Sequence, residues 1–195
     1  MAVALVPFSW ERVMNAHDKV RARLALATQA LADSGVRYAV AGGNAVQHHV
    51  ARADETQIRG TRDVDILIDR ADFEAVKRSL ESKGFRYRHV AGIDVFLDGA
   101  ESKVGDAVHI LYAGEKVRDH ELAANPGVDE IEQTEDFRVL ALEPLVRIKL
   151  TAYRRKDQVH LQDMIRVGLI DPSWVSRFTP ELGHRLQILL DDPDG

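Results

Sequence analysis

Hydrophobic residues recur every three or four positions along the first part of the chain. Ser9 suits a helix N-cap, and Ser34-Gly35 suits a helix end. Between them the apolar and semi-apolar positions are Trp10, Val13, His17, Val20, Leu24, Ala27 and Leu31. This stripe predicts one amphipathic helix, or two helices with a break near residues 17–18, docked on a globular core. A coiled-coil seam has similar spacing.

Short apolar runs alternate with helical patterns through the middle of the chain. Strands are predicted over residues 36–41, 63–68, about 85–97, 107–112 and 137–142. Helical patterns cover residues 44–50 and the stretch from Asp72 to Gly84. Residues 51–60 are polar and weakly patterned, so we expect a loop there. Strands mixed with helices predict an α/β core with a mixed sheet.

The pattern changes after Pro144, where strand-like runs give way to helical ones. Residues 145–156, 159–167 and 180–190 all have helical periodicity. We therefore predict three parts: an N-terminal helical segment (1–35) packed on the core, an α/β core (36–142), and a C-terminal helical part (143–195).

Composition excludes several classes of function. The absence of cysteine rules out disulfides, thiolate metal sites and thiol catalysis. A net charge of -5 argues against binding to nucleic acid through overall charge. The one run of three basic residues, 154–156, is typical of a solvated helix end. The apolar start is too short for a signal peptide and no run is long enough to cross a membrane, so we expect a cytoplasmic protein.

Asp63 and Asp65 are the strongest chemical signal. Alternate residues of a strand share a face, so both carboxylates stand on one face while Val64 and Ile66 point into the core. Like charges this close need a neutralising cation, and Mg²⁺ prefers carboxylate oxygen together with substrate phosphates. The pair predicts a metal site, although an exposed strand face can carry the same residues without one.

Gly42-Gly43 adds a second signal where the first predicted strand gives way to a helix. Glycines allow the backbone to approach a ligand closely, and the helix N-terminus beyond them offers free N–H groups to phosphate. A simple tight turn would need the same residues. Together with Asp63 and Asp65, the turn suits metal-assisted phosphoryl or nucleotidyl transfer.

Two segments, Ala41-Gly42-Gly43-Asn44-Ala45 and Thr61-Arg62-Asp63-Val64-Asp65-Ile66-Leu67, resemble the signature of the polymerase-beta-type nucleotidyltransferase superfamily. The resemblance is strongest to the small bacterial branch that includes antibiotic nucleotidyltransferases and abortive-infection toxins. It implies that Gly42, Gly43 and Asn44 bind a nucleoside triphosphate such as ATP. It also implies that Asp63 and Asp65 hold one or two Mg²⁺ ions.

The sequence departs from the family pattern in three places. Asn44 replaces the usual serine, although Asn can still cap a helix. The spacing from the glycines to Asp63 is longer than usual. His109 aligns where the third family carboxylate is expected, and Asp94 and Asp106 are substitutes by position only. His109 suits a base or a contact to the acceptor.

Three further residues are weaker candidates. Arg62, next to the carboxylates, suits a phosphate contact or a salt bridge to an acidic neighbour. The resemblance pairs Lys149, as a nucleotide-binding residue, with Asp157. Without the resemblance, Lys149 could extend from the core edge and Asp157 could be the N-cap of a helix starting at Gln158.

The implied reaction is transfer of a nucleoside monophosphate from an NTP to an acceptor, with release of pyrophosphate. A small molecule such as an antibiotic, a tRNA end and a protein hydroxyl all fit as acceptor, and a cognate antitoxin is a possible partner of the toxin branch. The alternative is a catalytically degenerate module of the same fold that binds nucleotide or a partner.

Overall fold

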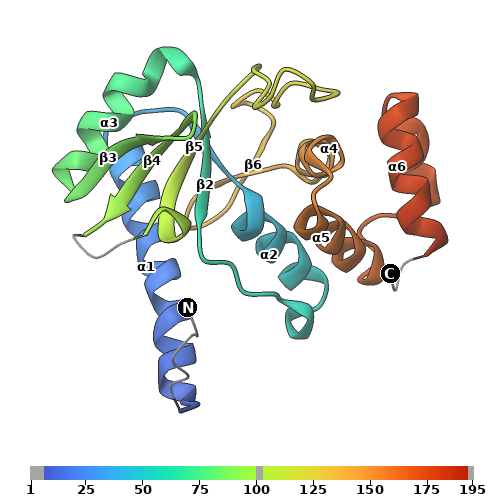
Figure 1. Ribbon diagram of the computed structural model, residues 1–195, viewed down its shortest axis with the longest axis horizontal. Helices are drawn as coiled ribbons and strands as arrows, with labels where there is room; N and C mark the ends of the chain where they lie inside the picture. Colours follow the sequence, from blue (N-terminus) through green and yellow to red (C-terminus); the bar gives the residue numbers. More distant parts are fainter. Residues whose placement is uncertain (1–6, 100–102, 193–195) are drawn as a thin grey trace.

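A seven-stranded mixed sheet forms the centre of the computed structural model, which describes residues 7–99 and 103–192 (Figure 1). The strands are β1 (Tyr38–Ala41), β2 (Val64–Ile68), β3 (Phe85–Val90), β4 (Ile93–Asp98), β5 (Ala107–Tyr112), β6 (Ile131–Gln133) and β7 (Arg138–Leu140). Their order is β3-β4-β5-β2-β1-β7-β6, in which β2 pairs with β5, and β1 with β7, in parallel. The predicted α/β fold with a mixed sheet is confirmed.

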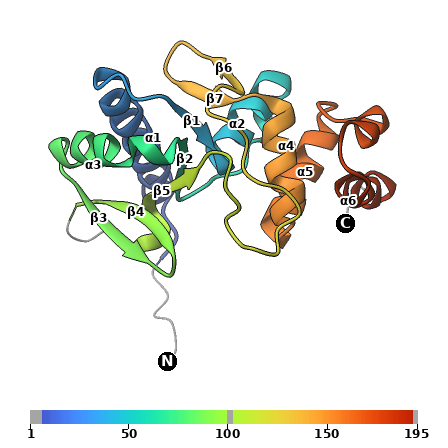
Figure 2. The ribbon, with the colours of Figure 1, turned by 90° about the horizontal axis from the view of Figure 1, so that it is seen from above.

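Helices flank the sheet on both sides (Figures 1 and 2). They are α1 (Trp10–Asp33), α2 (Gly42–Ala53), α3 (Phe73–Ser82), α4 (Leu142–Ala152), α5 (Arg155–Arg166) and α6 (Pro180–Asp191). Helices α1 and α3 pack together on one side, whereas α2, α4, α5 and α6 lie on the other. No helix in the described ranges is both long enough and apolar enough to cross a membrane.

Helix α1 is continuous, without a break at residues 17–18. Ser9 caps it as predicted, by accepting a hydrogen bond from the backbone N–H of Arg12. Only the second half of the predicted stripe is buried, including Leu24, Ala27 and Leu31. Trp10 is 72% exposed, because the first half of the helix extends beyond the sheet (Figure 1).

Several predicted boundaries were wrong. The run over residues 85–97 is a hairpin of two strands, since Ala91 and Gly92 both adopt positive φ and reverse the chain. Helix α2 begins two residues earlier than predicted and continues to Ala53, into the expected loop. Strand β6 was missed. Helix α4 ends at Ala152 because Tyr153 is left-handed, with a φ of 47°.

Strand register brings the chemical residues together at the centre of the sheet. Ala41, the last residue of β1, pairs with Asp65 of β2, and Asp65 pairs with His109 of β5. Val64 and Ile66 alternate with these positions and are fully buried in the core. The turn after β1 therefore lies beside the carboxylates, with His109 on their other side.

Candidate functional site

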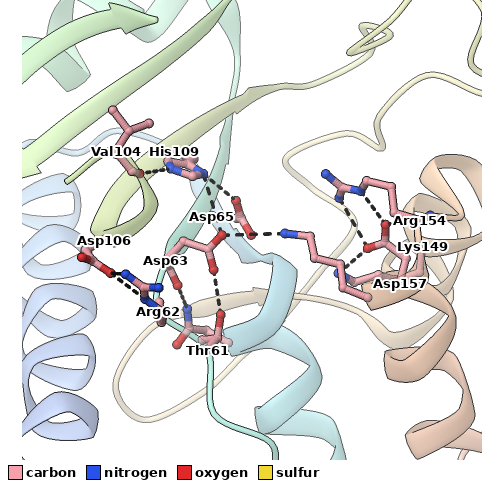
Figure 3. Close-up of polar contacts among 12 residues, drawn as sticks. Thr61, Arg62, Asp63, Asp65, Val104, Asp106, His109, Lys149, Arg154 and Asp157 are labelled. Carbon is pink, nitrogen blue, oxygen red and sulfur yellow. Dashed lines mark hydrogen bonds and ion pairs between the residues drawn. The ribbon is translucent and has the colours of Figure 1, made fainter. Parts of the chain in front are cut away.

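Asp63, Asp65 and His109 form a compact cluster at the junction of β2 and β5 (Figure 3). Nδ1 of His109 lies 3.6 Å from Oδ1 of Asp65 and 4.0 Å from Oδ2 of Asp63. One ligand atom from each residue falls within 4.8 Å of the others. Two carboxylates and an imidazole at this spacing could hold a divalent cation.

The charges around Asp65 favour its ionised form. Burial acts to raise the pKa of Asp65, but the contact with His109 and the positive charges of Lys149 and Lys156 outweigh it and hold the pKa below its ordinary value. In return, Asp65 raises the pKa of His109, although burial of the ring acts in the opposite direction. The cluster therefore keeps a negative charge, which the neighbouring histidine and lysines neutralise only in part.

Gly42 and Gly43 pack directly against the segment that carries the carboxylates, residues 61–65. Gly42 has a φ of 62°, and a Cβ there would lie 1.8 Å from Oδ2 of Asp65. A Cβ at Gly43 would lie 2.7 Å from Oγ1 of Thr61. Because α2 starts at Gly42 without a side-chain cap, its first N–H groups are available to an anion beside Asp65.

Replacing Gly42 by Ala is expected to weaken binding of Mg·NTP by roughly tenfold or more, because the new methyl group must displace the Asp65 carboxylate. The left-handed backbone should also cost about 1–2 kcal/mol of stability. Gly35→Ala is the matched control, since Gly35 has a φ of 70° but no atom within 4 Å of an added Cβ. Calorimetry and urea denaturation measure both effects. Unchanged nucleotide binding in Gly42→Ala would contradict the close approach.

Asn44 is not the cap of α2 but lies inside its first turn, a correction to the expectation from sequence. Its side-chain amide donates to the backbone carbonyl of Asp63 at 2.9 Å, which ties α2 to the start of β2. Thr61, which sequence reasoning did not single out, donates its hydroxyl to Oδ1 of Asp63 at 2.7 Å. Both residues thus fix Asp63 in place.

Lys156 is the main site residue that sequence reasoning missed. Its Nζ lies 3.8 Å from Oδ2 of Asp63, so the basic run 154–156 is not merely a solvated helix end. The residue lies in the first turn of α5, whose approach to the sheet depends on the left-handed turn at Tyr153. No local pattern in the sequence indicates that approach.

Lys149 and Asp157 form a buried ion pair, with Nζ 3.1 Å from Oδ1 and side chains 4% and 1% exposed. Asp157 is the third residue of α5 and not its N-cap, which corrects that alternative. It accepts hydrogen bonds from the backbone N–H and the guanidinium of Arg154. Burial acts to raise the pKa of Asp157, but Arg154 and Lys149 hold it below its ordinary value. The pair thus fixes the start of α5, which carries Lys156.

The remaining candidates lie outside the cluster. Arg62 is 74% exposed, and its guanidinium binds Asp106 at 2.8 Å and not Asp63 (Figure 3). Asp94 lies on the opposite face of the sheet, because its neighbour Val95 is the residue paired with His109. There Asp94 accepts hydrogen bonds from three side chains, those of Tyr87, His89 and Tyr112. Neither Asp94 nor Asp106 therefore supplies a third carboxylate to the cluster of Asp63, Asp65 and His109.

No protein-family model and no curated protein matches this sequence. Solved structures do match. A Helicobacter pylori protein assigned as a nucleotidyltransferase is 11% identical, with a TM-score of 0.52 over 96% of this chain and 98% of its own. The JHP933 protein of Helicobacter pylori is 15% identical, with a TM-score of 0.52 over 96% of this chain and 78% of its own. An antigenic nucleotidyltransferase-like protein from Paracoccidioides brasiliensis is 16% identical, with a TM-score of 0.54 over 92% and 91%.

Identities this low establish only the fold of the chain. The matches nevertheless extend over nearly the whole chain, from the N-terminal helix through the sheet to the C-terminal helices. The chain therefore has the nucleotidyltransferase fold that its resemblance to the polymerase-beta-type superfamily implies.

Proposed function

We propose that this protein is a metal-dependent nucleotidyltransferase that moves a nucleoside monophosphate from an NTP to an acceptor and releases pyrophosphate. One observation carries the proposal: the carboxylate of Asp65, with that of Asp63 two residues before it, stands beside the glycine turn and the uncapped N-terminus of α2. A cation and a triphosphate bound there would be neighbours. The chain has the fold that the sequence resemblance implies, and that resemblance implies such a site.

The residues present fit a divalent cation. Asp63 and Asp65 supply the hard oxygen ligands that Mg²⁺ accepts, and they lie on a common face within reach of a single ion. A bound cation would supply Lewis-acid polarisation of the transferred phosphoryl group. Thr61 and Asn44 would hold Asp63 in position, through the contacts described above.

The remaining residues have binding and positioning roles. The N–H groups at Gly42 and Gly43 would bind phosphate oxygens, and Lys156 would add a positive charge on the side of Asp63. Lys149, being buried against Asp157, would act on the nucleotide through its charge and through the position of α5. Arg62 could reach phosphate only by leaving Asp106.

A groove of about 1070 Å³ beside the site offers room for the acceptor. It runs between the first half of α1 and the segment that contains Thr61, and Arg12, His17 and Lys19 line its helical side. An antibiotic, a tRNA end or a protein hydroxyl would each be a suitable acceptor, and an antitoxin remains a candidate partner.

The test uses α-labelled NTPs with Mg²⁺ and three classes of acceptor: antibiotics, total tRNA and protein. We expect transfer of label to one class, with equimolar pyrophosphate, only when the divalent cation is present. The competing function is a degenerate binding module, which His109 in place of a carboxylate favours. Binding of Mg·NTP without transfer in the wild type, together with transfer in His109→Asp, would establish that module and overturn the proposal.

A further inference from the structure

His109 presents one particular ring nitrogen to the two carboxylates. Its Nε2 lies 2.8 Å from the backbone carbonyl oxygen of Val104. Because a carbonyl only accepts hydrogen bonds, Nε2 carries the ring proton, and in the neutral ring Nδ1 keeps a free lone pair. Nδ1 faces Asp65 and Asp63, whose nearest oxygens are 3.6 and 4.0 Å away, so a proton and a cation would compete for its lone pair.

This is the way in which proteins orient an imidazole that binds a metal. A metal-ligating histidine usually donates its other ring N–H to a backbone carbonyl or a carboxylate, which fixes the tautomer and the ring plane. The distances from Nδ1 to the carboxylates exceed those of ordinary hydrogen bonds, about 2.7–3.2 Å. Neighbouring ligands of an octahedral cation with bonds of about 2.1 Å lie about 3 Å apart, so the three side chains would need to approach one another by about 1 Å or less to share one ion.

The donor set then determines which cation is favoured. Mg²⁺ strongly prefers oxygen ligands, whereas imidazole nitrogen suits transition metals, and Mn²⁺ also accepts carboxylate. We propose that His109 is a metal ligand through Nδ1, and that the Asp63–Asp65–His109 site therefore binds a transition-metal cation such as Mn²⁺ in preference to Mg²⁺. The inference rests on the proposed function, because it specifies the cation used at the same site.

A ligand role and a general-base role for His109 exclude one another. Both require the lone pair of Nδ1, since Nε2 is bound to Val104. A base would leave the affinity for metal unchanged when the imidazole is removed. Removal of a ligand would lower that affinity. A measurement of metal binding alone therefore separates the two roles.

The structure offers a matched control in a second cluster with metal-ligating side chains. His48, His49 and Glu132 also place one ligand atom each within 4.8 Å of one another. There, however, the only carboxylate of the cluster, that of Glu132, is paired with Arg52 at 2.6 Å. His48→Asn therefore removes an imidazole without touching the carboxylate pair.

The experiment uses Mn²⁺ alone as probe, with the whole chain as wild type, His109→Asp, His109→Asn and His48→Asn. Titration followed by electron paramagnetic resonance gives the affinity, competition with Mg²⁺ gives the preference, and pulsed measurements detect coupling of Mn²⁺ to ¹⁴N. We expect ¹⁴N coupling in the wild type and in His48→Asn but in neither His109 variant. Affinity for Mn²⁺ should fall roughly 10–100-fold in His109→Asn, and His109→Asp should narrow or reverse the preference over Mg²⁺.

The ligand role is overturned if bound Mn²⁺ shows no ¹⁴N coupling, or if His109→Asn binds Mn²⁺ as the wild type does. Thermal unfolding of each variant shows which of the two substitutions keeps the fold, and one folded His109 variant is enough. Nitrogen-coupled Mn²⁺ without nucleotidyl transfer would leave this inference standing while the proposed function fails. Nucleotidyl transfer with Mg²⁺, together with bound Mn²⁺ that shows no ¹⁴N coupling, would leave the proposed function standing while this inference fails.

Discussion

Replacing Asp65 by Asn is expected to reduce nucleotidyl transfer roughly a thousandfold in kcat/KM, which is about 4 kcal/mol. The substitution keeps the size of the side chain, so the packing over Gly42 survives. It removes the negative charge on which the cation depends, and an amide oxygen is a much weaker ligand than a carboxylate. Transfer of label from an α-labelled NTP measures the rate, and calorimetry measures the affinity for Mg·NTP.

Asp69→Asn is the matched control for this prediction. Asp69 follows the same strand, but its carboxylate is paired with the exposed Arg37 at 2.7 Å, away from the cluster. Its loss should leave transfer within about twofold of the wild type, since exposed ion pairs contribute little. Equal transfer in the wild type and in Asp65→Asn would remove Asp65 from the reaction.

Asp157→Asn is expected to lower the free energy of unfolding by about 3–5 kcal/mol, because it leaves the buried ammonium of Lys149 without its counter-charge. The guanidinium of Arg154 loses the same partner. Urea denaturation at neutral pH measures the loss. The change should also displace the start of α5 and with it Lys156, so that affinity for NTP falls in the variant that remains folded.

The double variant Lys149→Met/Asp157→Leu separates charge from packing. Apolar side chains of similar volume should recover most of the lost stability, because neither charge is then buried alone. If the double variant is as unstable as Asp157→Asn, the loss comes from packing or from the hydrogen bonds to Arg154, and the ion pair is not its cause.

The sequence was sufficient to predict the residues that lie on regular elements at the site. Alternation along a strand placed Asp63 and Asp65 on one face, and the same rule on the strand 107–112 placed His109 towards them. The glycine turn was visible because Gly42 needs a positive φ beside Asp65. These positions depend on local geometry, which a single sequence contains.

The rest of the site depends on contacts between segments far apart in the chain. Lys156 faces Asp63 because Tyr153 adopts a left-handed conformation, which is uncommon for a residue other than glycine. Asp157 pairs with Lys149 only after the helices on either side of that turn fold back on each other. The hairpin turn was missed for a similar reason, since Ala91 is not a typical residue for a φ of 52°.

The parallel pairing of Val40 with Val139 has a consequence for how the molecule folds. Strands β2 to β6 lie between these two residues in the sequence. The chain must therefore close a long loop before β7 gains its contacts. Non-local parallel pairings of this kind slow folding. Helix α5, which carries Lys156, follows β7 in the chain and packs on α2 and α4. During synthesis, the two carboxylates therefore emerge well before the lysine that faces them, and the site becomes complete only in the final stages of folding.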